Sequence, residues 1–244
     1  MKDGGVFTAN TIAKTAVVLC PASGAAALTA GGRRLVLLVR HGQTDWNTER
    51  RLQGRESVPL NECGRRQAAE CAEMFRRAVD AGLVSRRCYT SPLDRAYDTA
   101  AVIAPSFGAA APTVVEGLIE RDYGELSGLT TEERREVYKN GGPDPEGEPV
   151  EEVAKRVKKA LVTLASDGTD GEVVAVTHGG VINALFYVIT GGRYGTGKNI
   201  SENCGVSIVA VGRDATFPVA YGLTGESFVS YVAEYRAALG RLGH

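Results

Sequence analysis

The amino-acid sequence predicts an α/β fold, a three-layer α/β/α sandwich around a mixed, mostly parallel sheet. Two short runs contain only apolar residues, Leu35 to Val39 and Val173 to Val176, as expected of strands that are buried on both faces. Amphipathic helical segments alternate with these runs, and this alternation is typical of an α/β fold. We expect residues 33–244 to form a single domain and residues 1–32 to be a flexible N-terminal extension.

The elements that follow the first strand are predicted from spacing and from turn chemistry. Residues 64–81 form a helix whose apolar positions recur every three or four residues. These positions are Ala68, Cys71, Ala72, Phe75 and Val79. Residues 88–90 form a short strand, and residues 92–104 form a helix with Pro92 in its first turn and Ser91 as its cap.

The middle of the chain gives weaker signals. Residues 114–116 are predicted as a short strand, and residues 130–139 as a helix that begins with Thr130 or Thr131 as its cap. Residues 140–149 are rich in glycine and proline, which predicts a loop.

The last third returns to clear periodicity. An amphipathic helix spans residues 150–166, and a second helix follows strand 173–176 and runs to about residue 189. Residues 207–211 and 217–221 are strands that pair across a short turn, and residues 226–240 form a closing helix.

The composition excludes several classes of protein. The chain has 28 basic and 29 acidic residues, so its balanced charge argues against a nucleic-acid or anionic-membrane partner. No run approaches the ~20 apolar residues that a membrane span requires. The five cysteines form no CxxC pair, which favours free thiols in a reducing compartment and hence a cytoplasmic protein. A weak transit peptide is the alternative interpretation of residues 1–32.

The candidate site begins with two strand ends that each carry a histidine. Arg40-His41-Gly42 follows the first buried strand, and Thr177-His178-Gly179-Gly180 follows the second. Ligands of α/β sheets bind beyond the carboxyl ends of the strands, so we expect both histidines at one edge. Arginine offers a fork of donors that suits phosphate, and a neutral imidazole is a nucleophile toward phosphorus. A histidine that merely packs is the simpler alternative for either position.

A zinc site is the competing use of two histidines. Zinc usually takes three or four protein ligands, and the sequence lacks local spacings such as HxxxH. The cationic Arg40 beside His41 also disfavours a metal ion.

Two further segments add candidates. Arg95 lies one turn into helix 92–104, near the same edge, although an ordinary solvated position is the alternative. Glu120, Asp122 and Glu125 follow strand 114–116, and a carboxylate there could act as general acid and base. Residue chemistry alone does not choose among these three.

Several motifs together resemble the histidine phosphatase superfamily, also called the phosphoglycerate mutase-like family. The resemblance covers residues 34–240, and its motifs are highly specific in combination. They are, in family order, LVRHGQTDWN ending at Asn47, LQG at 52–54, PLNECGRRQA at 59–68, SPLDRAYDTA at 91–100, ERDYGELSG at 120–128 and VTHGG at 176–180.

The resemblance implies a role for each matching residue. It implies that His41 is the nucleophile that becomes phosphohistidine and that Glu120 is the proton donor. The implied ligands of the phosphoryl group are Arg40, Asn47, Gln53, Gly54, Arg95, His178 and Gly179. It also implies a phosphoglycerate mutase-like fold, no metal or other cofactor, and a small phosphorylated metabolite as the partner. A homodimer is a further expectation drawn from the family.

Departures from the family pattern indicate where specificity lies. Arg55 stands where many relatives carry tryptophan, and Arg193 lies in the loop at 191–205. We take Arg55, Tyr123 and Arg193 as candidate specificity residues that could meet a second anionic group. Arg134 and Arg135 lie on helix 130–139 and are expected on its solvated face.

The resemblance is compatible with two activities, hydrolysis of a phosphomonoester and the phosphoryl transfer that a mutase catalyses. True mutases of the family carry a long insert between the acid segment and a Gly-Glu segment. Here only 26 residues separate Glu120 from Gly147, so we expect a metal-independent phosphomonoester hydrolase. A non-catalytic regulator on the same fold should have lost Arg40, His41 or Glu120, and all three are present.

Overall fold

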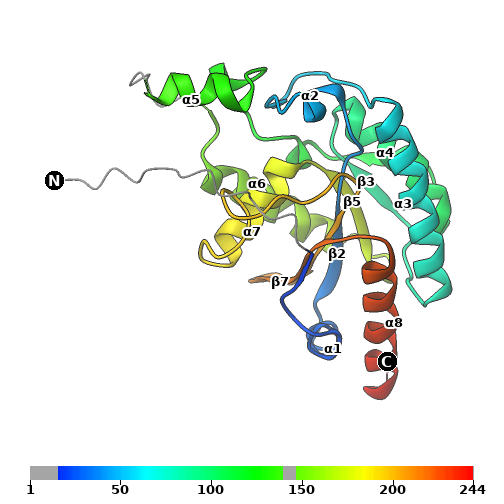
Figure 1. Cartoon of the computed structure of the whole chain (residues 1–244). Coiled ribbons are helices and arrows are strands. Elements are labelled where there is room, and N and C mark those ends of the chain that lie inside the picture. Colours follow the sequence, from blue (N-terminus) through cyan, green and yellow to red (C-terminus); the bar gives the residue numbers. More distant parts are fainter. Residues whose placement is uncertain (1–15, 140–146, 244) are drawn as a thin grey trace.

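A seven-stranded mixed sheet runs through the middle of the described part of the chain (Figure 1). The structure is a computed structural model and describes residues 16–139 and 147–243. The strand order is β1-β7-β6-β2-β5-β3-β4. The strands are β1 (Val17–Val18), β2 (Arg34–Arg40), β3 (Cys88–Thr90), β4 (Thr113–Val114), β5 (Val173–Thr177), β6 (Val206–Val211) and β7 (Thr216–Leu223).

The sheet is mixed, and most of its strands point the same way. β2, β5, β3 and β4 are mutually parallel, whereas β6 is antiparallel to β2. β7 reverses the direction again, and β1 runs antiparallel to β7. The predicted mostly parallel α/β fold is therefore confirmed, as is the pairing of the last two strands across a short turn.

Helices cover both faces of the sheet. The helices are α1 (Ala22–Ala30), α2 (Asp45–Thr48), α3 (Glu62–Asp80), α4 (Asp94–Ile103), α5 (Thr131–Lys139), α6 (Val150–Ala165), α7 (Gly179–Ile189) and α8 (Gly225–Arg241). The described residues also form the short 3-10 turns η1 (Ala104–Phe107), η2 (Glu116–Leu118) and η3 (Gly124–Leu126). One core holds α1, α3, α4 and α8 against the sheet, and a second holds α6 and α7 against the opposite face.

The central strand β2 shows why its sequence is apolar throughout. Leu35 and Leu37 belong to the core under α3 and α8, whereas Val36 and Leu38 belong to the core under α6 and α7. Successive side chains of a strand point to opposite faces, so a strand covered on both faces needs an apolar residue at every position.

The prediction that residues 1–32 form a flexible extension is wrong for residues 16–32. β1 pairs with β7, and α1 packs on α8 with Ala25 and Ala26 fully buried. The Tyr231 hydroxyl donates to the carbonyl of Cys20 at 3.1 Å. α1 is composed mostly of alanine and other small residues, which let it lie close to the core but produce little contrast between its faces. Residues 1–15 lie outside the described part of the chain.

The packing of α1 on α8 should contribute to the stability of the domain. Deleting residues 1–30 should lower the free energy of unfolding by at least about 3 kcal/mol, because burial of one large apolar side chain contributes about 1.5–3 kcal/mol and the deletion uncovers several. Deleting only residues 1–15 is the matched control, since it keeps β1 and α1. Urea unfolding of both forms measures the difference, and equal midpoints would contradict this role of α1.

A second correction concerns Ser91. The helix after β3 begins at Asp94 with Leu93 as its N-cap, so Ser91 is not the cap. Its hydroxyl lies 2.7 Å from Nε2 of His178.

For helix α5, Thr130 does fill the predicted cap position, since its Oγ1 accepts the backbone N–H of Glu133 at 3.2 Å. Among the described residues, no helix is both long and apolar enough to cross a membrane.

Candidate active site

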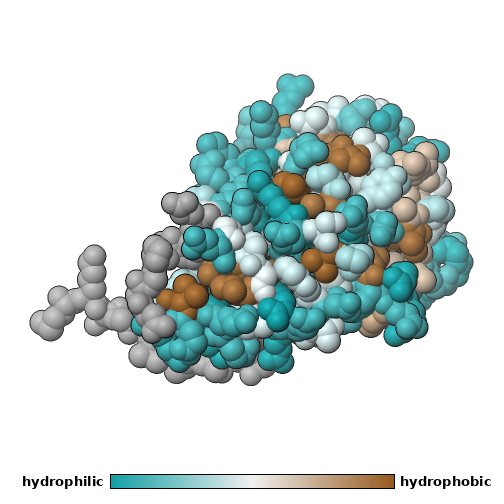
Figure 2. All heavy atoms as spheres, turned by 90° about the horizontal axis from the view of Figure 1, so that it is seen from above, coloured by the Kyte–Doolittle hydropathy of each residue, from teal (hydrophilic) through white to brown (hydrophobic). Residues whose placement is uncertain are grey.

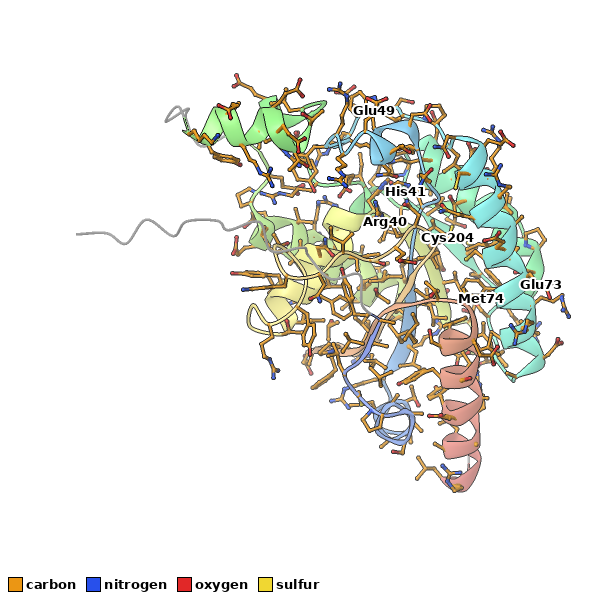
Figure 3. The ribbon with its side chains drawn as sticks, viewed as in Figure 1. Arg40, His41, Glu49, Glu73, Met74 and Cys204 are labelled. Atoms are coloured by element: carbon orange, nitrogen blue, oxygen red, sulfur yellow. The ribbon has the colours of Figure 1, made fainter. Side chains whose placement is uncertain are left out.

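The two histidines lie side by side at the carboxyl edge of the sheet. β2 and β5 are parallel neighbours in which Arg40 pairs with Thr177, so the residue after each strand end is a histidine. The ring centroids of His41 and His178 are 5.2 Å apart. Figure 3 shows Arg40 and His41 at this end of β2, and the predicted convergence is confirmed.

Hydrogen bonding fixes the proton on the His41 ring. Nδ1 lies 2.7 Å from the carbonyl oxygen of Gly42, which can only accept, so Nδ1 must carry the proton. Nε2 of the neutral ring then holds a free lone pair. Burial, followed by the charges of Arg95 and Arg40, holds the pKa of His41 well below its usual range. The His41 ring is therefore uncharged at neutral pH.

The nitrogen of His178 that has no partner among the described residues is Nδ1, whereas in His41 the free nitrogen is Nε2. Its Nε2 lies 2.7 Å from the Ser91 hydroxyl, which also accepts the N–H of Leu93 at 3.3 Å, and Nε2 of His178 is the acceptor that the described residues offer to the Ser91 proton. We therefore assign the proton of neutral His178 to Nδ1. Burial and the charge of Arg95 keep the pKa of His178 well below its usual range. The His178 ring thus offers an N–H donor to the site.

Arg40 is held with part of its guanidinium free. Its Nη1 donates to the carbonyl of Ser201 at 2.5 Å, while its buried Nε has no partner among the described residues. A Cβ on Gly179 would lie 3.3 Å from this Nε, so glycine at 179 leaves room for the arginine. Burial lowers the pKa of Arg40, although the Glu120 carboxylate opposes this effect.

Arg95 is almost fully buried, at 1 % exposed, and organises the loop that carries Gly54. Its Nη2 and Nη1 donate to the carbonyls of Gly54 and Glu56, each at 2.7 Å. Burial lowers the pKa of Arg95 to about 10, so it stays charged at neutral pH. The solvated alternative for Arg95 is therefore wrong.

Glu120 is the carboxylate that reaches the site. Its Oε1 accepts the N–H of Arg121 at 2.7 Å, and its Oε2 accepts the N–H of Gly180, two residues past His178, at 3.2 Å. Burial raises the pKa of Glu120, while the two backbone donors and Arg95 oppose the increase. Of its rivals, Asp122 accepts the N–H of Gly124, and Glu125 is exposed.

The remaining implied phosphate ligands are Gln53, Gly54 and Asn47. Gln53 is buried, and its Oε1 has no partner among the described residues. Gly54 adopts φ +52°, a left-handed conformation that favours glycine. Oδ1 of Asn47 accepts from Asn203 at 3.2 Å, and Nδ2 of Asn203 also donates to the carbonyl of His41 at 2.9 Å. Sequence reasoning missed Asn203, which no local pattern distinguishes.

The three candidate specificity residues are placed differently. Tyr123 lies beside the acid, because a Cβ on Gly180 would collide with both its hydroxyl and the Glu120 carboxylate. Arg55 lies within 3.4 Å of Glu148 and 3.8 Å of Asp122, so two carboxylates already neutralise its charge. Arg193 follows the far end of α7, where its Nε donates to the carbonyl of Thr190. The structure does not bring Arg193 to the histidines.

The arrangement suits a small oxyanion. Three buried N–H groups without a partner among the described residues meet here, on Arg40, Arg95 and His178. Two of these residues are cationic, and fixed donors of this kind stabilise charge on a phosphoryl group.

Within the described residues, no group of three or more His, Cys, Asp or Glu side chains could hold a metal ion. Figure 2 shows this side of the molecule, whose surface is mostly hydrophilic with hydrophobic residues in scattered groups.

Residues 36–224 match the sequence pattern of the histidine phosphatase superfamily (branch 1). The chain belongs to the histidine phosphatase superfamily. Among curated relatives, an uncharacterized phosphatase of Bacillus subtilis is 38 % identical over 161 residues, which cover 64 % of this chain and 78 % of the relative. A metal-independent phosphoserine phosphatase of Arabidopsis thaliana is 36 % identical over 166 residues, covering 64 % and 68 %. A probable phosphoglycerate mutase of Cronobacter sakazakii is 36 % identical over 187 residues, covering 71 % and 83 %.

Solved structures of this superfamily share the fold. A mycobacterial glucosyl-3-phosphoglycerate phosphatase is similar with a TM-score of 0.64 and 26 % identity, covering 78 % of this chain and 100 % of that one. A phosphoserine phosphatase of Entamoeba histolytica, solved with 3-phosphoglyceric acid, gives a TM-score of 0.63 at 26 % identity, covering 78 % and 97 %. The predicted family and its phosphatase class of enzyme are confirmed.

Proposed function

We propose that this member of the histidine phosphatase superfamily is a metal-independent phosphomonoester hydrolase that acts through a phosphohistidine on His41. The observation that carries the proposal is the bond between Nδ1 of His41 and the Gly42 carbonyl at 2.7 Å. It leaves Nε2 free for attack in a pocket of buried N–H donors. The same bond stabilises the positive charge that the ring gains when it is phosphorylated.

The reaction has two steps. Nε2 of His41 attacks phosphorus, the bond to the ester oxygen breaks, and the protonated Glu120 carboxyl gives its proton to that oxygen. Arg40, Arg95 and His178 stabilise the charge on the transferring oxygens. In the second step, the Glu120 carboxylate takes a proton from water as the water oxygen attacks phosphorus. The P–N bond breaks, and phosphate and the free enzyme result.

Phosphate release with and without EDTA tests this proposal. The full chain should hydrolyse p-nitrophenyl phosphate at the same rate in both conditions. Acid-labile phosphate trapped during turnover should map to His41 by mass spectrometry. Loss of turnover in EDTA with recovery on addition of a divalent metal would contradict the mechanism.

Hydrolysis is favoured over mutase activity because the segment between Glu120 and Gly147 is short. A mutase must keep water away from the phosphohistidine while the substrate reorients. Parallel assays of phosphate release and of 2-/3-phosphoglycerate interconversion separate the two activities. Interconversion faster than release would establish the mutase alternative.

Arg134 is the residue that supports a substrate with a second anionic group. We expected Arg134 on a solvated face of the helix, but its side chain is only partly exposed. Its Nη2 donates to Oγ1 of Thr131 at 2.9 Å. It forms no ion pair with any described residue, and it lies near Tyr123 and Glu132, of which Tyr123 adjoins the Glu120 carboxylate. Arg135, its neighbour on α5, is exposed and pairs with Glu132 at 3.9 Å.

Replacement of Arg134 should therefore act selectively. We expect R134A to lower kcat/KM for a phosphomonoester that bears a carboxylate by about tenfold, the effect of losing one charged hydrogen bond of about 1.5 kcal/mol. Activity on p-nitrophenyl phosphate should stay near that of the wild type. R135A is the matched control on the same helix, and equal effects of R134A and R135A would contradict a specific role.

A further inference from the structure

Two thiols that are far apart in the sequence meet behind the catalytic strand end. Cys71 lies on α3, and Cys204 lies two residues before the start of β6. Both are buried, at 3 % and 7 % exposed. The Cys71 thiol lies 3.7 Å from the carbonyl oxygen of Cys204, so the two residues are direct neighbours. Both residues also line the same pocket.

A pocket gives small molecules access to this pair. Its volume is about 240 Å³, and both cysteines line it together with Gln67, Met74, Asn203 and Thr224. In Figure 3, Cys204 lies next to Arg40 and His41, with Met74 of α3 on its other side. A water molecule occupies about 30 Å³ in the liquid, so the pocket admits a hydroperoxide.

The backbone around Cys204 holds the catalytic residues. The N–H of Cys204 donates to the carbonyl of Arg40 at 2.9 Å, and the carbonyl of Gly205 accepts the N–H of Arg40 at 3.1 Å. Asn203 holds the carbonyl of His41. Cys204 has φ +59°, a left-handed conformation that is uncommon outside glycine and is found at functional sites. Movement of Cys204 would therefore displace Arg40 and His41.

We propose that Cys71 and Cys204 are an oxidisable thiol pair, which a hydroperoxide converts to a disulfide that lowers the activity of the neighbouring site. The effect on turnover rests on the proposed phosphatase function, whereas the formation of the bond does not.

The chemistry balances with hydrogen peroxide as the oxidant. The Cys204 sulfur attacks one oxygen of the peroxide, the O–O bond breaks, and Cys204 sulfenic acid and one water form. The Cys71 sulfur then attacks the Cys204 sulfur, its proton leaves with the sulfenic oxygen, and a second water forms. Two thiols are oxidised and one peroxide is reduced. Cys204, the more exposed of the two, meets the oxidant first.

A disulfide brings the two sulfur atoms to about 2.04 Å. Because Cys71 is fixed within the long helix α3, the segment at 203–205 takes up this movement. A displacement of about 1 Å at catalytic groups can cost roughly 10²-fold in rate, so we expect a loss of about tenfold or more.

In the experiment, the full chain is treated with hydrogen peroxide, and both the Cys71–Cys204 disulfide and the phosphatase activity are measured. Mass spectrometry should show the loss of two hydrogen atoms and a peptide in which Cys71 is joined to Cys204. Hydrolysis of p-nitrophenyl phosphate should fall and recover with dithiothreitol. C71A should form no such peptide and lose no activity reversibly, and C71S replaces it if C71A fails to fold. C63A, on the same helix but outside the pocket, should respond like the wild type.

Each outcome decides the proposal. Failure to recover the Cys71–Cys204 peptide would overturn the pairing, and a peptide formed without loss of turnover would overturn the regulation. If peroxide inactivates C71A as strongly and as reversibly as the wild type, the sensitive group lies elsewhere and the proposal is overturned. Absence of turnover before oxidation would contradict the proposed phosphatase function instead, while the peptide still reports on the thiol pair.

Discussion

Replacement of His41 should abolish turnover. We expect H41A to lower kcat for p-nitrophenyl phosphate by about 10⁴-fold or more, because removal of a nucleophile leaves only binding and charge stabilisation. The protein should remain folded, since the backbone N–H of His41 still donates to the carbonyl of Thr177 at 3.0 Å. Steady-state kinetics measure the rate, and circular dichroism with thermal unfolding checks the fold.

The other two histidines of the chain provide control variants for this test. H178A removes a donor but keeps the nucleophile, so it should slow turnover and still accumulate acid-labile phosphate. H244A changes the last residue of the chain and should match the wild type. Turnover by H41A at a rate near that of the wild type, or phosphate trapped on His178 in the native enzyme, would refute the assignment of His41.

Replacement of Glu120 should have the second largest effect. We expect E120Q to lower kcat for an alkyl phosphate by about 10²- to 10⁴-fold, the usual contribution of a general acid. p-Nitrophenolate leaves without protonation, so the first step on p-nitrophenyl phosphate should be affected far less. A burst of p-nitrophenol followed by slow turnover would show that the second step still needs the Glu120 carboxylate.

The pH dependence separates the acid from the nucleophile. Because burial raises the pKa of Glu120, the proton is retained to a higher pH than in an exposed glutamate. Activity on alkyl phosphates should therefore fall as pH rises through this raised pKa, and E120Q should lack that basic limb. The lowered pKa of His41 places the acidic limb well below pH 6.5, its unperturbed value. E125Q, at an exposed carboxylate of the same segment, is the control and should keep both limbs.

The site could be predicted where its residues follow buried strands. A strand covered on both faces must be apolar at every position, so β2 and β5 stand out in the sequence and mark Arg40, His41 and His178. The choice of Glu120 among three nearby carboxylates depended on the family resemblance. In the structure, its buried contact with Gly180 distinguishes it from Asp122 and Glu125.

The rest of the site depends on contacts between distant segments. Asn203 reaches the carbonyl of His41 across 162 positions of the chain, and Ser91 reaches His178 across 87. Neither residue has a local pattern that sets it apart from an ordinary loop or cap residue. Helix α1 was missed for a different reason. Its small residues pack closely enough to bury it, but they leave no periodic apolar stripe.

The position of β2 has a consequence for hydrogen exchange. The amides of Arg40 and His41 donate to the carbonyls of Gly205 and Thr177, at the carboxyl end of the central strand of a sheet that helices cover on both faces. Amides in such a position exchange only through global unfolding. We therefore expect these two amides to be among the slowest in the protein to exchange with deuterium. Mild denaturant should then abolish enzymatic activity only when the whole domain unfolds.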